Sequence, residues 1–229
     1  MIETISARKS SGTGLALGPG PQTTDSYFKR TDGKESGFFG TLNAADVATA
    51  NDLKALTGWN VATPTWMKFI LDGKVLFIPT TTLVDGIARS TMYQKGLVYG
   101  RDDFGGYPDG ANVLQNKKLV VNGYTYLVRL PRISLKDTYT AADMPESEWA
   151  RLMWTIDKNT TASDTESGSK WASINTGTPG HHCMTAQVPA TATGNANCIG
   201  YESIKVPSSL GRTSGNPNVG WRPVLELIP

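Results

Sequence analysis

The feature that most constrains this fold is the apolar run near the end of the chain. Residues 224–228 read Val-Leu-Glu-Leu-Ile and follow the sequence Gly220-Trp221-Arg222-Pro223. Val224, Leu225, Leu227 and Ile228 are too apolar for a solvated tail, so they predict a strand inserted into a sheet built by earlier segments. The alternative is an apolar tail that adheres to other surfaces without a fixed partner. The predicted strand would tie the end of the domain to its core.

Length and charge exclude several classes of partner. The 229 residues suffice for one large domain or two small ones, with a core that needs neither metals nor disulfides. Charged residues are only 18% and the formal net charge is +2, so no strong field favours nucleic acid or a membrane as partner. The apolar runs are too short for a membrane span, and the start of the chain lacks signal-peptide features. We therefore expect a soluble protein made in a cytoplasm.

Two histidines and two cysteines form the candidate metal set: His181, His182, Cys183 and Cys198. The set has no Cys-x-x-Cys and no His-x-x-x-His spacing, and adjacent histidines on an extended segment point to opposite faces. We expect no metal and no cofactor, but free buried thiols beside surface histidines. A Cys183–Cys198 disulfide in an oxidising medium stays open.

Residues 1 to about 40 contain Gly/Pro/Ser-rich stretches at 10–14 and 18–21 and few large apolar side chains. Such a segment cannot fold around a core of its own. We expect residues 1–40 to be an extended N-terminal docking arm and residues 41–229 to be the globular domain.

Two hairpins and several helices are predicted within the domain. Asp72-Gly73 and Asn122-Gly123 lie between β-rich runs, at 66–79 and 119–130, and suit two-residue type I′ turns. Helical spacing and caps predict helices over 43–57, 90–95 and about 145–156, and residues 97–100 read as a short strand. Residues 160–217 are rich in Gly, Thr, Ser and Asn and predict a long irregular segment, of the kind that is often functional. The fold class expected is α+β.

No motif for catalysis is evident. The chain has no phosphate-binding loop and no Gly-x-Ser-x-Gly elbow, and its acid pairs, Asp102-Asp103 and Glu146/Glu148, are explained by solvation and by a helix dipole. A glycosidase would need two convergent acids from separate elements. Among the aromatic residues, Trp66, Trp149, Trp154 and Trp221 suit core packing, whereas Trp171 and Tyr201 lie in the irregular segment and are candidates for surface contact.

Several blocks along residues 38–229 together resemble a domain common in virion proteins of tailed bacteriophages, in the same order. The most specific block is Gly-Trp-Arg-Pro-Val-Leu-Glu-Leu at 220–227. The other blocks are Phe-Phe-Gly at 38–40, Trp-Met-Lys-Phe at 66–69, Gly-Lys-Val-Leu-Phe-Ile at 73–78, Gly-Leu-Val-Tyr-Gly at 96–100, Gly-Tyr-Thr-Tyr-Leu-Val-Arg-Leu at 123–130 and Glu-Trp-Ala-Arg-Leu-Met at 148–153.

The closing motif is also similar to the Gly-Phe-Arg ending of formylglycine-generating-enzyme-like domains, which belong to the C-type-lectin-like folds that phages use to display variable loops. Catalytic members of that group rely on a pair of active-site cysteines. Cys183 and Cys198 do not lie in a matching sequence context. The resemblance therefore implies a non-enzymatic C-type-lectin-like scaffold, attached to a particle by an extended arm.

The leading hypothesis is a structural virion component of the capsid-decoration or head-fibre type, synthesised in the bacterial host cytoplasm. Its expected partners are capsid or tail subunits and further copies of itself. The alternative is a tail or baseplate protein that recognises a host surface glycan or receptor, with Trp171, His181, His182 and Tyr201 as contact residues. A third hypothesis is an enzyme of the formylglycine-generating type or a glycan hydrolase.

Overall fold

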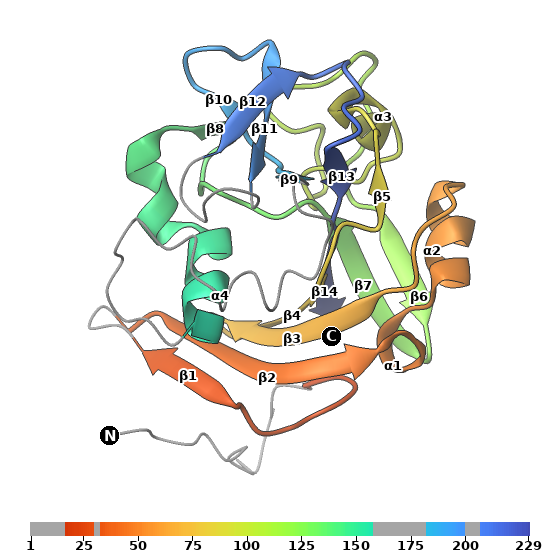
Figure 1. Ribbon diagram of the computed structural model, residues 1–229, viewed down its shortest axis with the longest axis vertical. Helices are drawn as coiled ribbons and strands as arrows, with labels where there is room; N and C mark the ends of the chain where they lie inside the picture. The colour runs from red at the N-terminus through yellow and green to blue at the C-terminus, as the bar shows by residue number, and fades with distance from the viewer. Residues whose placement is uncertain (1–16, 30–32, 158–181, 200–206) are drawn as a thin grey trace.

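The computed structural model describes residues 17–29, 33–157, 182–199 and 207–229. The fold is α+β, as the sequence predicts: short helices lie around a seven-stranded sheet and a smaller five-stranded sheet (Figure 1). Within the described residues, no helix is both long enough and apolar enough to cross a bilayer.

The seven-stranded main sheet has the order β1-β2-β3-β4-β14-β7-β6, and every neighbouring pair is antiparallel. The C-terminal strand β14 lies in its interior, between β4 and β7, which confirms the prediction made from the apolar end of the chain. The strands are β1 (Ser26–Lys29), β2 (Glu35–Asn43), β3 (Thr65–Leu71), β4 (Lys74–Pro79), β6 (Lys118–Val121), β7 (Tyr124–Arg129) and β14 (Val224–Ile228).

Both predicted hairpins are confirmed. Asp72 and Gly73 join β3 to β4 with φ angles of 47° and 79°, and Asn122 and Gly123 join β6 to β7 with 53° and 77°. Positive φ at both central residues is what a type I′ turn requires, and Asp, Asn and Gly tolerate it best.

The segment expected to be irregular instead builds most of a second sheet, with the order β12-β11-β9-β13-β5. Its strands at 182–184 and 195–199 consist largely of small or polar residues that are buried on both faces, such as Cys183, Ala196 and Cys198. Such strands lack the alternation of apolar and polar residues by which a strand is recognised in sequence. The strands are β5 (Val84–Asp85), β9 (His182–Met184), β11 (Asn195–Ile199), β12 (Ser208–Gly211) and β13 (Val219–Trp221); β8 (Thr138–Tyr139) and β10 (Val188–Pro189) form a separate parallel pair.

The helix expected over 43–57 is two helices, α1 (Ala44–Val47) and α2 (Ala50–Thr57). Asn43 caps the first helix as predicted, and Gly58 ends the second in the left-handed conformation. The break arises because Thr49 forms a second capping box with Asp52, which holds Thr49 in an extended conformation.

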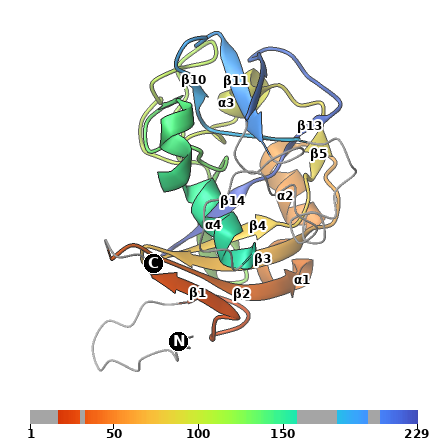
Figure 2. The ribbon, with the colours of Figure 1, turned by 60° about the vertical axis from the view of Figure 1, so that its left-hand side comes forward.

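The remaining helices are α3 (Arg89–Gln94), the 3₁₀ turn η1 (Ala141–Glu146) and α4 (Glu148–Asp157). α3 confirms its prediction, but α4 begins at Glu148 and not near Pro145, because Ser147 is extended and its hydroxyl accepts a hydrogen bond from Ala150 N. Residues 97–100 form a buried connection in place of the expected strand. α4 lies across β1, β2 and β3 (Figure 2).

The expected boundary at residue 40 needs correction, because it falls inside β2. β1 and β2 belong to the main sheet, and their polar residues Ser26 and Ser36 are buried against Thr155 of α4. Ser26 Oγ donates to Thr155 O over 2.7 Å, and the Ser36 and Thr155 hydroxyls lie 2.6 Å apart. A segment poor in large apolar residues thus joins the domain through strand pairing and through hydrogen bonds to a distant helix. Residues 1–16 of the expected arm lie outside the described residues.

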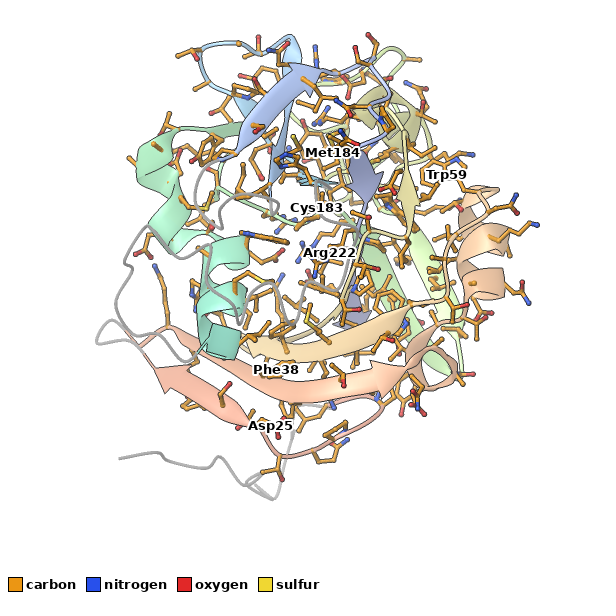
Figure 3. All side chains as sticks on the ribbon, viewed as in Figure 1. Asp25, Phe38, Trp59, Cys183, Met184 and Arg222 are labelled. Carbon is orange, nitrogen blue, oxygen red and sulfur yellow. The ribbon has the colours of Figure 1, made fainter. Side chains whose placement is uncertain are left out.

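The closing motif forms the junction between the two sheets. Trp221 pairs with Val84 in the second sheet, and three residues later Val224 begins β14 in the main sheet. Arg222 is buried between them (Figure 3); it donates to Pro79 O from Nε (2.7 Å) and to Thr80 O from Nη2 (2.9 Å). The core positions expected for Trp66, Trp149 and Trp221 are confirmed, whereas the Trp154 side chain lies outside the described part.

Gly220→Ala should destabilise the protein, because a Cβ at this position would overlap Asp85 Oδ1 and lie 2.7 Å from Thr82 Cβ. We expect a loss of about 1–3 kcal/mol in the free energy of unfolding, as for other overpacked sites, measured by urea denaturation. The matched control is Gly194→Ala, where the added Cβ would meet nothing within 4 Å. Equal stability of the two variants would contradict this account of the junction between β5 and β13.

Candidate functional site

Of the four candidate contact residues, the structure describes only His182. It is the first residue of β9, is half-buried, and lies opposite Val219 of β13. Trp171, His181 and Tyr201 lie outside the described residues. The described residues next to them in the chain, His182 and Ile199, are nevertheless close together. His182 begins β9, Ile199 ends β11, and Ile199 pairs with Cys183 of β9. The two segments that carry these three candidates therefore join the described chain at neighbouring strand ends.

The described surface of the second sheet is small and polar. β12 exposes Ser208 and Ser209, and the turns around it expose residues 190–192 and 213–215. Six of these eight positions are serine, threonine or glycine, and the other two are alanine. Such side chains form adaptable hydrogen bonds and are common in binding loops. This surface can contact polar partners, but it contains no cluster of catalytic groups among its described residues.

The two cysteines are free thiols on opposite faces of the second sheet. Cys183 pairs with Ile199 and Cys198 with Met184, so the cysteines are diagonal neighbours in adjacent strands. Successive residues of a strand point to opposite faces, and the two cysteines accordingly pack in different apolar clusters. A Cys183–Cys198 disulfide would require a shift of strand register. The alternative that the sequence left open is therefore excluded in this fold.

Neither thiol has the properties of a nucleophile. Burial raises the pKa of Cys183 to about 11, although the nearby Arg222 opposes that effect. Burial, followed by the neighbouring Cys183, raises the pKa of Cys198 to about 12. Reactive cysteines have a lowered pKa and some exposure to solvent. The geometry thus gives these residues a packing role.

One buried charge network fixes the start of α4 to the main sheet. Arg129 of β7 donates to both carboxylate oxygens of Glu148, over 2.8 and 2.6 Å, and to Glu226 Oε2 of β14 over 3.0 Å. Lys74 of β4 binds the other Glu226 oxygen over 2.6 Å. Burial raises the pKa of Glu226, but Arg129 and Lys74 outweigh burial and hold it below its ordinary value. This network joins four elements and leaves none of its charges unpaired.

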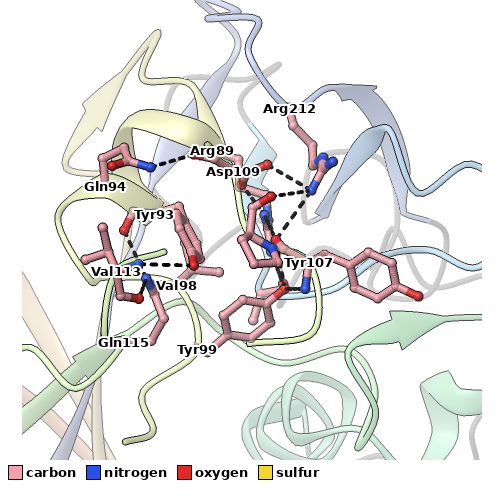
Figure 4. A network of polar contacts seen from close by, with 12 residues as sticks. Arg89, Tyr93, Gln94, Val98, Tyr99, Tyr107, Asp109, Val113, Gln115 and Arg212 are labelled. Atoms are coloured by element: carbon pink, nitrogen blue, oxygen red, sulfur yellow. Dashed lines mark hydrogen bonds and ion pairs between the residues drawn. The ribbon is translucent and has the colours of Figure 1, made fainter. Parts of the chain in front are cut away.

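A second network holds the long connection of residues 101–116 (Figure 4). Arg89 of α3 is fully buried and forms an ion pair with Asp109; it also donates to Tyr99 Oη over 2.9 Å and to Ala186 O over 2.8 Å. Arg212 binds the second Asp109 oxygen over 3.0 Å. Sequence reasoning missed this site, since Arg89 and Asp109 are single residues 20 positions apart without a motif.

The acids singled out from the sequence all have partners of their own. Asp102 accepts from Asn116 Nδ2 over 2.6 Å, and Asp103 accepts from Arg101 Nε over 2.6 Å. Burial raises the pKa of Asp103, but its hydrogen bonds from Gly105 N and Arg101 hold it below the usual value. A general acid needs a raised pKa, whereas the pKa of Asp103 is lowered, so Asp103 is unsuited to that role.

Among the residues that the structure describes, no group of three or more histidine, cysteine, aspartate or glutamate side chains is arranged to hold a metal ion. The chain matches no known protein family, curated protein or solved structure.

The native thiols should be inert. At pH 8 we expect Cys183 and Cys198 to react with a chromogenic disulfide reagent only after denaturation, because both are buried and protonated. A Leu135→Cys variant is the control, since Leu135 is 80% exposed, and it should add one fast-reacting thiol. Rapid labelling of the native wild type would contradict the packing role and favour an enzymatic use of the cysteines.

Proposed function

We propose that this protein is a non-enzymatic structural component of a tailed-phage virion, of the capsid-decoration or head-fibre type, and that its domain is C-type-lectin-like. The resemblance supports this proposal through residues that matter to the fold. Its most specific block, at 220–227, carries Trp221 and Arg222, which are buried at the junction between the sheets. A resemblance in such positions concerns the architecture and not a variable surface.

The proposal that the protein is not an enzyme rests on one observation: both buried charge networks described above serve packing. Arg89 and Arg129 are each paired with carboxylates that fix chain segments in place, and both cysteines are buried and protonated. Enzyme active sites instead place perturbed groups where a substrate can reach them. In the described part of the chain, these groups are buried where no substrate can contact them.

The arrangement of the two sheets suits attachment to a particle at one end of the molecule and display of a polar surface at the other. β1, which begins at Ser26, lies at one edge of the main sheet, and β11 and β12 lie at the opposite end of the molecule in both views (Figures 1 and 2). In this proposal the N-terminal residues dock on capsid or tail subunits, and the second sheet faces outward. Copies that dock on a regular particle surface would form a homo-oligomeric array.

Two truncations test the attachment. Removal of residues 1–16 should leave a domain that melts cooperatively but no longer joins particles, measured by calorimetry and by particle incorporation. Removal of residues 1–43 should abolish the cooperative transition, because it deletes β1 and β2 and leaves Thr155 of α4 without two hydrogen-bond partners. Normal incorporation of the shorter deletion would overturn the docking role of residues 1–16.

The second candidate function is recognition of a host glycan or receptor. The observation that favours it is the convergence of the attachment points at His182 and Ile199, beside a small polar surface. In this proposal Trp171, His181, His182 and Tyr201 make the contact, and stacking of aromatic rings on a sugar supplies part of the affinity.

Trp171→Ala and Tyr201→Ala should abolish adsorption of particles to host cells and leave the melting temperature unchanged. Trp149→Ala is the matched control: Trp149 is fully buried, so its loss should cost about 3–5 kcal/mol of stability. Adsorption is measured by particle depletion from suspension. Wild-type adsorption by both Trp171→Ala and Tyr201→Ala would eliminate this function, and a stability loss like that of Trp149→Ala would assign these residues to packing.

A further inference from the structure

Residues 17–22 form a strap across the face of the main sheet opposite α4. Beneath it lies Lys68 of β3, which is fully buried. Lys68 Nζ donates to Pro19 O over 2.9 Å and to Pro21 O over 2.5 Å. Gln22 Nε2 folds back to Gly18 O and Gly20 O, over 3.1 and 2.6 Å. The strap is thus organised by donors that bind its own carbonyl groups.

The surroundings of the Lys68 ammonium group are neutral. Phe39 of β2 lies beside it, with its ring centroid 4.8 Å from Nζ, and Phe77 is its partner on β4. No carboxylate in the described part of the chain forms an ion pair with Lys68, and the strap contributes only backbone carbonyl oxygens and the neutral Gln22 amide. The acid nearest to the strap in sequence is Asp25, which is exposed and lies beside Gly40. Burial of a cation without a counter-charge is unfavourable.

The strap itself buries little apolar surface. Gly18 lies against Leu227 and Phe77, and Gly20 lies against Leu42, so its closest contacts with the sheet involve residues without side chains. Leu17 is its one large apolar side chain, and it is only partly buried. Segments with few buried apolar contacts are the first to open locally.

We propose that the strap opens and closes over Lys68, and that opening is coupled to the protonation of this side chain. In the closed state Lys68 is enclosed by the strap, Phe39 and Phe77. In the open state water would replace the two carbonyl groups and solvate the ammonium ion. A proton on Lys68 therefore favours the open strap.

The direction of the pH dependence follows from burial. Burial lowers the pKa of Lys68 from 10.5 to about 8 in the closed state, whereas an exposed lysine keeps the ordinary value. Below pH 8 both states hold the proton, and the closed state bears the full desolvation penalty. As the pH rises through 8 towards 10.5, Lys68 loses its proton in the closed state before it does so in the open state. The equilibrium between the two states therefore shifts towards closure by up to about 300-fold, since each unit of pKa difference is tenfold.

Opening would change the reach of the N-terminal segment. When the six residues of the strap leave the sheet, they add about 20 Å of extended chain to the segment that precedes Leu17. Under the proposed function this would set how far residues 1–16 extend towards a neighbouring subunit. The coupling itself does not rest on the proposed function, and it can be tested on the isolated full-length protein, apart from particle incorporation.

The test is a carbon-13 NMR titration of the lysine Cε atoms in the full chain. Wild type should show one lysine with a midpoint near pH 8, and Lys68→Met should lack that signal. Gly20→Val should return the midpoint towards 10.5, because a Cβ at Gly20 would overlap Leu42 Cδ2 and displace the strap. Gly58→Val is the matched control: Gly58 also has a positive φ, of 77°, but its Cβ would meet nothing within 4 Å, so the midpoint should stay near 8.

A second measurement needs no strap mutation. Prolyl endopeptidase cleaves after proline, and its rate on wild type, relative to a synthetic peptide of residues 15–25, should fall as the pH rises from 7.5 to 9.5. Lys68→Met should show a constant relative rate. A wild-type Lys68 that titrates near 10.5 would overturn the proposal, as would a midpoint near 8 in Gly20→Val or equal pH profiles for wild type and Lys68→Met.

Discussion

The two sheets depend on one interaction, the binding of the Arg222 guanidinium group to the carbonyl oxygens of Pro79 and Thr80. The chain crosses between the sheets at this point twice, from β4 to β5 and from β13 to β14. Arg222 belongs to the second crossing and binds the first, and its guanidinium carbon lies 5.5 Å from the centre of the Trp149 ring of α4. One side chain thus joins both crossings to the helix that covers the main sheet.

Other buried cations have the same structural role. Arg129 joins α4 to β7 and β14, and Arg89 holds the connection of residues 101–116. Buried cations paired in this way specify one arrangement of segments that have few apolar residues of their own. A protein with only 18% charged residues therefore uses several of them inside the molecule. This pattern suits a rigid scaffold that presents a polar surface.

The sequence predicted those parts of the fold whose causes are local. Asp72-Gly73 and Asn122-Gly123 specify their turns by backbone preference, and the apolar run at 224–228 requires burial. The second sheet was missed because β9 and β11 have small residues buried on both faces. β1 and β2 were missed because Ser26 and Ser36 find their partner, Thr155, more than 100 residues away. The same limit applies to the candidate site. Topology alone brings together Arg89 and Asp109, Lys68 and the strap carbonyls, and the two cysteines. The roles of Trp171, His181 and Tyr201 stay predictions.

The interior position of β14 has a consequence for synthesis on the ribosome. β14 joins the half of the main sheet that ends at β4 to the half that begins at β7, and it is translated after every other strand of this sheet. Until it emerges, β4 and β7 each present an unpaired edge rich in apolar residues, which is a ready template for pairing with other chains. A nascent chain of this protein therefore has to be shielded from its neighbours until translation has passed Ile228.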